Sequence, residues 1–350
     1  MNILDCQGCL SIKKTHDKEA RRRKPAESDE DVLILSLGHN FAVDAHQKIG
    51  PSKALRRLGD KTQVLTRATI NAHVRDRLTH TNEVANISTM ISRILGLNEN
   101  LCLAIAKAHD IGHAPFGHLG EKVISEITGR NFRHEVFGAV ISQHIERGGQ
   151  GLNLTHQVLQ GILNHSRGAQ NPVRAVNVSE EANAVTFADK IAYIWNDIKD
   201  IFERTKILDI RDFPKIKKLT ELCGKNQRER ISFCVENLCY ESAERGYIFF
   251  GDSEAAQIFF ELKKEMFEVY RQTNVLNGAE ILKKVYDFLT KTDLIGNADP
   301  AVVLALMTDT DVISLSEGKC INIGDFKRCS VSEIVPYLKD IDFTNPDLSW

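Results

Sequence analysis

The sequence has no long apolar run and no recognisable secretion signal. Nowhere in its 350 residues is there anything close to the about 20 consecutive apolar residues that a membrane-spanning helix needs. The opening residues, MNILDCQGCL, lack both the basic start and the long apolar segment of a signal peptide. We therefore expect a cytoplasmic protein with no membrane partner.

The sequence also has little excess charge of either sign. Its 45 basic and 47 acidic residues give a net charge of −2, which implies no general attraction to nucleic acid or membranes. The one strongly basic run, residues 21–24, is followed at once by the acidic AESDED. Such runs are more often solvated chain than a binding site, so we expect a flexible arm over residues 1–38, with nucleic-acid binding as the alternative.

Cysteine usage indicates no disulfide framework and no zinc ribbon. The eight cysteines are scattered, and Cys6 and Cys9 form the only CxxC pair. A zinc ribbon needs a second such pair, so we expect free, reduced thiols.

Strand-like alternation and internal repeats are lacking as well, and helical periodicity dominates. From His80 the apolar stripe continues through Val84, Ile87 and Ile91 at spacings of three or four and ends near Gly96. Ser179 is a good N-cap for a helix that reaches about residue 202. Further helices are predicted from residue 98 and at 120–128, 134–147, 155–165, 215–223, 227–245, 252–273, 278–291 and 298–308.

These patterns predict an all-α protein. We expect a helical core over residues 39–210 and a C-terminal helical extension of the same domain over 211–350. Segment 166–178 reads as a loop, and the tail from Ser316 as mixed, with room for a short hairpin or helix.

Titratable chemistry is concentrated in residues 106–122, AKAHDIGHAPFGHLGEK. His80 and His109 each continue the apolar stripe of their own helix, so both should point inward. Asp110 follows His109, and a buried carboxylate is costly unless it is paired or binds a metal. Asp189, between Phe187 and Ile191, is the best further inward acid.

Together these four residues offer two nitrogen and two oxygen ligands. That mixture suits a catalytic divalent ion with positions left for water and substrate oxygen better than a closed structural zinc site. Such an ion could lower the pKa of bound water and clamp a phosphate. For Asp197 and Asp200, further along the same helix, the alternative is a solvated acidic face.

The segment His109 to His113 also resembles the HExxH signature of zinc proteases. That chemistry needs both histidines on one continuous helical face. Gly112 and the following Ala114-Pro115 interrupt the helix, and Asp110 is shorter than the glutamate base. We therefore set the protease interpretation aside.

The order His80, His109-Asp110, Asp189 resembles the H…HD…D pattern of the HD superfamily of metal phosphohydrolases. The surroundings resemble deoxyguanosine triphosphate triphosphohydrolases and related dNTP triphosphohydrolases. The matching segments include ALRRLGDKTQV (54–64), RDRLTHTNEV (75–84), AHDIGHAPFGHLGE (108–121), GLNLTHQVLQGILNHSRG (151–168) and ADKIAYIWNDIKD (188–200).

The resemblance implies an HD-domain helical bundle that hydrolyses a dNTP to the deoxynucleoside and tripolyphosphate, and so controls dNTP pools. It implies that the four residues above hold a divalent Mn, Mg, Fe, Co or Zn ion, and that the protein is a homo-oligomer. It assigns catalysis to His118 and Glu121, to which we add His113 and His134. Phosphate contacts fall to Arg77 and Lys190, and sugar contacts to Tyr193 and Asp197.

Three segments depart from the usual family sequence. Residues 44–49 lack the usual arginines, Glu135 replaces an asparagine, and VVLALMTDT (302–310) lacks an arginine. Base selectivity and any allosteric nucleotide site are therefore left open. Two alternatives to dNTP hydrolysis remain: an HD phosphohydrolase for a nucleoside monophosphate or cyclic nucleotide, and a non-catalytic dNTP sensor.

Overall fold

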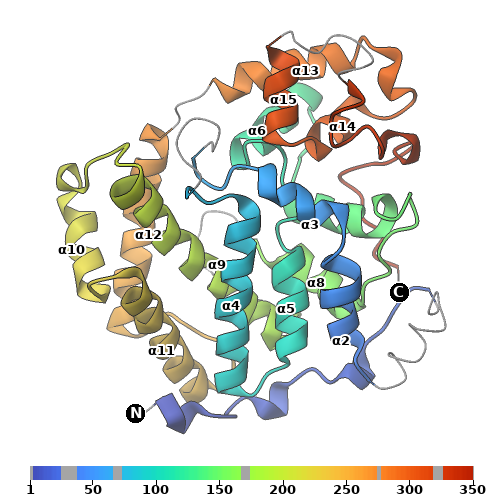
Figure 1. Ribbon diagram of the computed structural model, residues 1–350. Helices are drawn as coiled ribbons and strands as arrows, with labels where there is room; N and C mark the ends of the chain where they lie inside the picture. Colours follow the sequence, from blue (N-terminus) through green and yellow to red (C-terminus); the bar gives the residue numbers. More distant parts are fainter. Residues whose placement is uncertain are drawn as a thin grey trace.

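The computed structural model describes residues 3–24, 38–65, 73–166, 174–273, 277–317 and 326–349 (Figure 1). Within these ranges the chain is helical, and its only β contacts are isolated bridges between Thr62 and Asp76 and between Ala298 and Lys339. The predicted all-α class is confirmed.

Most helices lie where the periodicity predicts them, whereas the helices at 40–43, 53–57 and 309–316 match no predicted helix. The α-helices are α2 (Asn40–Val43), α3 (Lys53–Arg57), α4 (Arg77–Leu95), α5 (Glu99–Ala108), α6 (His118–Thr128), α7 (His134–Val140), α8 (His156–Asn164), α9 (Glu180–Ile198), α10 (Pro214–Cys223), α11 (Gln227–Arg245), α12 (Glu254–Gln272), α13 (Gly278–Leu289), α14 (Pro300–Leu306) and α15 (Asp309–Ser316). Three π-helical segments directly continue α2, α7 and α9. They are η4 (Asp44–Ile49), η7 (Ile141–Ile145) and η8 (Lys199–Arg204). Short 3₁₀ turns are η1 (Ile3–Cys6), η2 (Ser11–Lys13), η3 (Asp17–Glu19), η5 (Leu58–Asp60), η9 (Ile210–Asp212), η10 (Asp293–Ile295) and η11 (Val335–Tyr337).

At the centre of the fold, α4 packs against both α5 and α9 (Figure 1). Helix α4 begins where the Asp76 side chain accepts a hydrogen bond from the Thr79 backbone N–H at 2.7 Å. It ends at Gly96, whose φ of 81° places it in the left-handed region. The predicted N-cap Ser179 accepts a hydrogen bond from the Ala182 N–H and starts α9.

The C-terminal helices form two groups. Helices α10, α11 and α12 pack together, and α11 contacts both α4 and α9. Helices α13, α14 and α15 lie at another end, where α13 and α14 contact α6 (Figure 1). In the tail, residues 326–349 contain only the 3₁₀ turn η11, whereas residues 318–325 lie outside the described ranges.

The N-terminal segment differs in part from the predicted flexible arm, because residues 3–24, although mostly exposed, contact the helical core at several points. Cys6 and Leu10 are fully buried, and the backbone N–H of Leu10 donates to the Leu95 carbonyl at 2.8 Å. Within the basic run, Arg22 forms a buried ion pair with Asp44 at 2.6 Å. Charge composition alone could not show that this arginine has a buried acidic partner. Residues 1–2 and 25–37 of the predicted arm lie outside the described residues.

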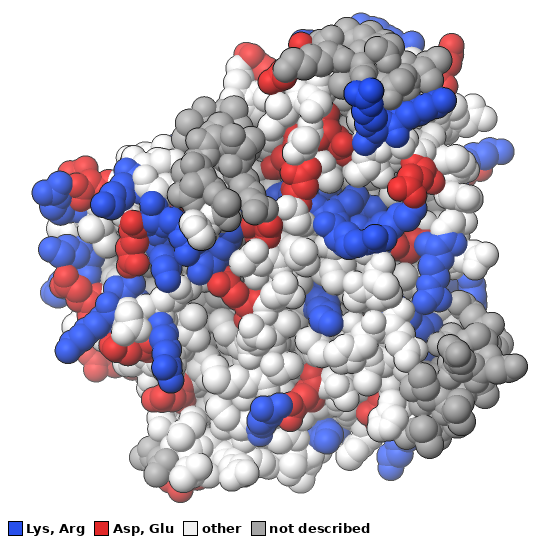
Figure 2. Space-filling model, in the orientation of Figure 1, with Lys and Arg blue, Asp and Glu red and all other residues white. Residues whose placement is uncertain are grey.

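The seven cysteines in the described ranges are free thiols, as predicted, and Cys320 lies outside those ranges. Across the described helices, none combines the length and apolar character needed to cross a bilayer. On the face in Figure 2, acidic and basic side chains are interspersed over the α10–α12 side. Nucleic-acid binding therefore stays a prediction.

Candidate active site

The loop between α5 and α6 brings most of the titratable residues together. His109 directly follows α5, and His118 opens α6 after a turn in which Phe116 and Gly117 both have a φ of 59°. Gly112 lies against the start of α7, since a Cβ there would lie 2.0 Å from the His134 carbonyl oxygen. Only glycine allows this approach, which places His134 beside the loop. Because α5 ends at Ala108, His109 and His113 share no continuous helix, which argues against the protease interpretation.

Four of the predicted residues converge in a first group, which we call the Asp110 cluster: His80, His109, Asp110 and Asp189. His80 Nε2 lies 3.0 Å from Asp189 Oδ1. His109 Nε2 lies 3.4 Å from Asp110 Oδ1 and 3.8 Å from Asp189 Oδ1. The Asp110 cluster thus joins α4, the α5–α6 loop and α9.

The hydrogen bonds of His109 show that this cluster could hold a cation. Its Nδ1 donates to the Ala106 carbonyl at 2.7 Å, which leaves the lone pair on Nε2. That Nε2 is buried and has no hydrogen-bond partner, although it faces two carboxylates. Ligand atoms of His80, His109 and Asp110 all lie within 4.8 Å of one another. The donor set therefore fits a divalent metal ion.

Both carboxylates of the cluster are anionic. Burial alone would raise the pKa of Asp110, but nearby His109 and His113 outweigh it and hold that pKa well below its usual range. Burial is likewise outweighed at Asp189, where Lys190 and His80 hold the pKa well below its usual range. Two buried negative charges favour a cation between the ligands.

Basic side chains lie beside these carboxylates. Arg77 Nη1 is 2.7 Å from Asp110 Oδ2, and Lys190 Nζ is 2.8 Å from Asp189 Oδ2. Lys263, on α12, is buried near them, and burial, followed by the charge of Lys190, lowers its pKa to about 8. The sequence did not identify Lys263, because the exposed Lys264 stands directly beside it on α12 and only the fold distinguishes the buried lysine.

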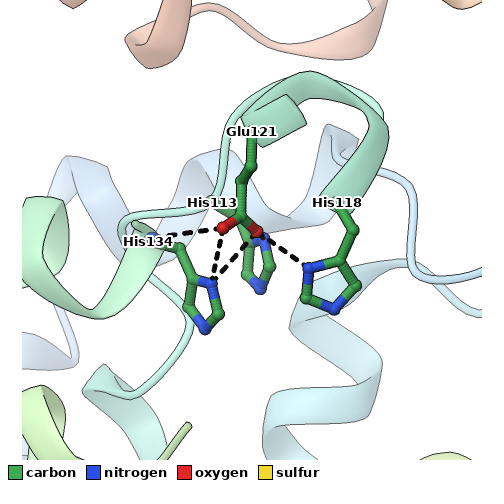
Figure 3. Close-up of side chains that lie close together, drawn as sticks. All are labelled: His113, His118, Glu121 and His134. Atoms are coloured by element: carbon green, nitrogen blue, oxygen red, sulfur yellow. Dashed lines mark hydrogen bonds and ion pairs between the residues drawn. The ribbon is translucent and has the colours of Figure 1, made fainter. Parts of the chain in front are cut away.

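A second group surrounds a glutamate, and we call it the Glu121 cluster: His113, His118, Glu121 and His134. Figure 3 shows the three imidazole rings around the Glu121 carboxylate. His118 Nδ1 lies 2.9 Å and His134 Nδ1 3.0 Å from Glu121 Oε1, and both make hydrogen bonds with it. His113 Nδ1 is also 3.0 Å from Oε1 but makes no aligned hydrogen bond. The His118 side chain is 77% exposed, so this cluster opens to solvent.

The two clusters are joined through His113, whose Nε2 lies 3.2 Å from Asp110 Oδ1. Burial and the charge of Arg77 lower the pKa of His113 to about 3, so it is neutral. Burial opposes the charged form of His134 as well, but Glu121 outweighs it and raises the pKa of His134. His113 is thus a neutral link between two anionic centres.

The predicted sugar contacts lie further along α9. Asp197 is buried, and its Oδ2 accepts a hydrogen bond from the Tyr270 hydroxyl at 2.8 Å. Its Oδ1 is buried without a partner, and burial raises the pKa of Asp197 to about 7. Tyr193 is half-buried, with its ring 5.5 Å from Lys190 Nζ. A solvated acidic face was the alternative for Asp197 and Asp200. It is wrong, because both side chains are buried.

A clamp from distant segments, which sequence reasoning missed, holds the α5–α6 loop. Lys61 Nζ donates to the carbonyls of His113 and, at 3.0 Å, Ala305. Asp309, at the start of α15, accepts hydrogen bonds from the backbone N–H groups of Thr62 and Phe116, both at 2.9 Å. The C-terminal extension therefore fixes the turn that leads into His118.

His165 was also missed. It directly follows α8, is buried, and places its Nε2 3.0 Å from His134 Nε2. In the sequence it stands alone in ILNHSRG, and no spacing relates it to the other histidines.

The helical fold and the His/Asp cluster define an HD-domain protein: residues 77–194 match the family described as HD domain. A deoxyguanosinetriphosphate triphosphohydrolase-like protein of Clostridium tetani is 36% identical over 286 residues, or 79% of this chain and 79% of that protein. A protein of the same name from Caldanaerobacter subterraneus subsp. tengcongensis is 39% identical, over 80% of this chain and 78% of that protein. Another, from Clostridium perfringens, is 37% identical, over 79% of this chain and 80% of that protein.

The chain therefore belongs to the family of deoxyguanosinetriphosphate triphosphohydrolase-like proteins. This membership and the cluster able to hold a metal together support a metal-dependent phosphohydrolase.

Proposed function

We propose that the protein is a metal-dependent dNTP triphosphohydrolase that releases the deoxynucleoside and tripolyphosphate and so controls dNTP pools. The names of its relatives support the substrate class. The observation that carries the proposal is the position of His113, a member of the Glu121 cluster whose Nε2 lies 3.2 Å from Asp110 Oδ1. This contact joins residues that could hold a metal to a histidine–carboxylate group. Hydrolysis of a phosphoester needs both a cation for the phosphate and a group that moves a proton.

His80, His109, Asp110 and Asp189 would hold the divalent ion. When bound, such an ion polarises a phosphoryl oxygen and lowers the pKa of bound water. Imidazoles are borderline ligands and carboxylates are hard ligands. A site with two of each is compatible with Mn, Mg, Fe, Co and Zn. Arg77 and Lys190, beside the two carboxylates, would bind the phosphate oxygens.

His118 would move the proton. Its Nδ1 donates to Glu121, which fixes the ring and leaves Nε2 for the attacking water or the departing 5′ oxygen. His134 donates to the same carboxylate and holds it in place, and His113 connects it to Asp110. The exposure of His118 gives it access to a substrate that arrives from solvent.

Tyr193 and Asp197 would recognise the sugar. The Oδ1 of Asp197 is buried without a partner and is free to accept a hydrogen bond from a 3′-hydroxyl. The Tyr270 hydroxyl already holds the other oxygen and so orients the carboxylate. The Tyr193 ring would close the space beside C2′ and exclude a 2′-hydroxyl.

Product analysis tests the proposal directly. The protein is incubated with each of the four dNTPs and Mn²⁺ or Mg²⁺, and the products are separated by anion exchange. We expect tripolyphosphate and deoxynucleoside in equal amounts. Orthophosphate or pyrophosphate as the first product, or turnover confined to monophosphates or cyclic nucleotides, would indicate another HD phosphohydrolase. Binding without any turnover would indicate a dNTP sensor. We also expect a homo-oligomer, which light scattering would detect.

A further inference from the structure

We propose that Cys6 and Cys9 form a redox-active dithiol, which a low-molecular-weight disulfide oxidises to an intramolecular disulfide that holds the N-terminal segment on the end of α4. The two residues are the only CxxC pair in the sequence, and no step of dNTP hydrolysis uses them. Cys9 is exposed, whereas Cys6 is fully buried. This difference gives the two thiols separate tasks.

The chain between the two cysteines is a tight turn. The Cys9 backbone N–H donates to the Cys6 carbonyl at 3.2 Å, and Gly8 has a φ of 72°, in the left-handed region. A turn closed in this way brings its first and fourth Cα atoms within about 7 Å of each other. A disulfide needs Cα atoms about 4.4 to 6.8 Å apart. The backbone therefore needs little movement to form the bond.

The Cys9 side chain turns back toward Cys6. Its Sγ donates a hydrogen bond at 3.3 Å to the carbonyl of Asp5, the residue that directly precedes Cys6. Burial, followed by the charge of the nearby Cys9, raises the pKa of Cys6. Because only the thiolate is nucleophilic, Cys6 does not react first. The exposed Cys9 is the thiol that meets an oxidant, and Cys6 reacts with it afterwards.

The reaction consists of two thiol–disulfide exchanges. The Cys9 thiolate attacks one sulfur of the small disulfide, whose S–S bond breaks, and one half leaves as a thiolate. Cys6 then gives up its proton and attacks the Cys9 sulfur, which releases the second half as a thiolate. Two protein thiols are thus oxidised, the small disulfide is reduced to two thiols, and the two protons pass to those products.

The same turn caps the C-terminal end of α4, as Figure 1 shows. The backbone N–H groups of Gly8 and Leu10 donate to the carbonyls of Ile94 and Leu95 at 2.9 and 2.8 Å. The last four carbonyls of a helix lack partners within it, so these bonds satisfy two of them. A Cβ at Gly96 would lie 2.9 Å from the Gly8 Cα, so the turn packs tightly on the helix end. A disulfide across the turn would hold this cap in place.

Cys239 on α11 is the alternative partner for Cys6. The turn η1 contacts α11, and burial, followed by the charge of Cys6, raises the pKa of Cys239, so the two thiols lie near each other. Cys239 is fully buried, as Cys6 is, and neither thiol of that pair can meet an oxidant first. The exposed Cys9 makes the CxxC turn the better site for oxidation.

The aromatic disulfide dithiobis(nitrobenzoate) tests the inference on the folded protein without reference to dNTP turnover. Cys320→Ala serves as the parent protein, because Cys320 lies outside the described residues and its reaction is removed in this way. We expect two nitrothiobenzoate ions per chain, the second released in a first-order step whose rate does not depend on reagent concentration. Mass spectrometry should show the loss of two hydrogen atoms in the peptide that contains Cys6 and Cys9.

Three variants of the parent separate the roles of the thiols. Cys9→Ala, a change at an exposed position, should release no ion in the same time, since the other cysteines in the described ranges are buried. Cys6→Ala should release one ion and keep the other half of the reagent bound to Cys9. Cys239→Ala is the matched control and should release two ions, as the parent does.

Amide hydrogen exchange tests whether the disulfide holds the cap. Exchange of the Gly8 and Leu10 backbone N–H groups should slow by about tenfold in the oxidised parent, because closing the short Cys6–Cys9 loop removes chain entropy from the opened state. Faster exchange at these groups would show that the disulfide breaks the cap, which contradicts the proposed effect on α4.

One ion per chain with a stable adduct on Cys9 in the parent would overturn the inference, because Cys6 would then not reach Cys9. Release of two ions with the bond between Cys6 and Cys239 would overturn it as well. If Cys6→Ala does not melt cooperatively, the ion counts and peptide masses of the parent and Cys9→Ala decide.

Discussion

The Asp110 cluster and the Glu121 cluster are built from the same residue types but leave different atoms unsatisfied. In the Asp110 cluster, the buried His109 Nε2 has no hydrogen-bond partner and faces two carboxylates. In the Glu121 cluster, His118 and His134 both donate to the carboxylate, and the buried Nδ1 of His113 is the one ring nitrogen beside it that makes no aligned hydrogen bond. An unsatisfied lone pair between anions calls for a cation, whereas a satisfied histidine–carboxylate pair can exchange a proton.

Exposure separates one histidine of each cluster in the same way. His109 is fully buried, while the His118 side chain is 77% exposed. A metal held inside the bundle keeps its ligands away from competing water, and a proton carrier must reach the substrate. Histidine content alone therefore does not assign a role, whereas hydrogen-bond partners and exposure do.

The largest effect is expected from Asp110→Ala, which removes the carboxylate at the centre of the first cluster. Activity should fall to background, because bound Mn²⁺ is lost. The variant also leaves Arg77 buried without its partner, a change that typically destabilises a protein by about 3 to 5 kcal/mol. Metal analysis and thermal melting check both effects, and normal Mn²⁺ content would contradict the assignment.

His118→Ala should separate the roles of the two clusters, because we expect it to affect proton transfer and not metal binding. We expect kcat to fall by about 10²-fold or more, the usual scale for a general acid or base, with Mn²⁺ content and dNTP affinity unchanged. Steady-state kinetics and equilibrium dialysis on the same preparation check this. Turnover near that of the wild type would remove His118 from the mechanism.

Asp309→Ala should have an intermediate effect by loosening the turn before His118. Without the hydrogen bonds to Thr62 and Phe116, kcat should fall by about 10- to 100-fold, since a misplacement of about 1 Å can cost 10²-fold. The neighbouring Thr310 is exposed, and its hydroxyl donates a hydrogen bond to Asp60 instead of to the loop. Thr310→Ala is therefore the matched control. Equal losses in both variants would mean that α15 acts through general stability and not through the loop.

Asp197→Ala should have the smallest effect, because it removes one hydrogen bond to the sugar. KM for dNTPs should rise by up to about tenfold, and KM for dideoxynucleotides should hardly change. Kinetics with matched dNTP and ddNTP pairs measure the difference. Equal damage to both would show that Asp197 supports the fold through Tyr270 instead of binding the sugar.

Periodicity and capping predicted most of the fold, since both are local. Ser179 was identified because an N-cap needs only a hydroxyl before a helical stripe, and the structure confirms it. Asp189 was placed inward by its apolar neighbours on α9, and it does lie beside His80. These predictions needed no knowledge of distant contacts.

The features that the sequence did not reveal depend on distant partners. Arg22 looked solvated because its partner Asp44 lies in another segment. Asp309 falls just beyond the predicted helix 298–308, and its contact with Phe116 arises only when the C-terminal extension folds back. His165 has no sequence neighbour that marks it, and its contact with His134 arises only when α7 and α8 pack together.

The central claim, that one cluster holds an ion and the other moves a proton, is tested most directly by one paired measurement. Bound Mn²⁺ per chain and kcat are determined together for Asp189→Asn and Glu121→Gln at saturating Mn²⁺. Asp189→Asn should lose bound Mn²⁺ and activity together, whereas Glu121→Gln should keep the wild-type Mn²⁺ content and lose about 10²-fold or more in kcat. Loss of Mn²⁺ in Glu121→Gln together with full Mn²⁺ content in Asp189→Asn would contradict it.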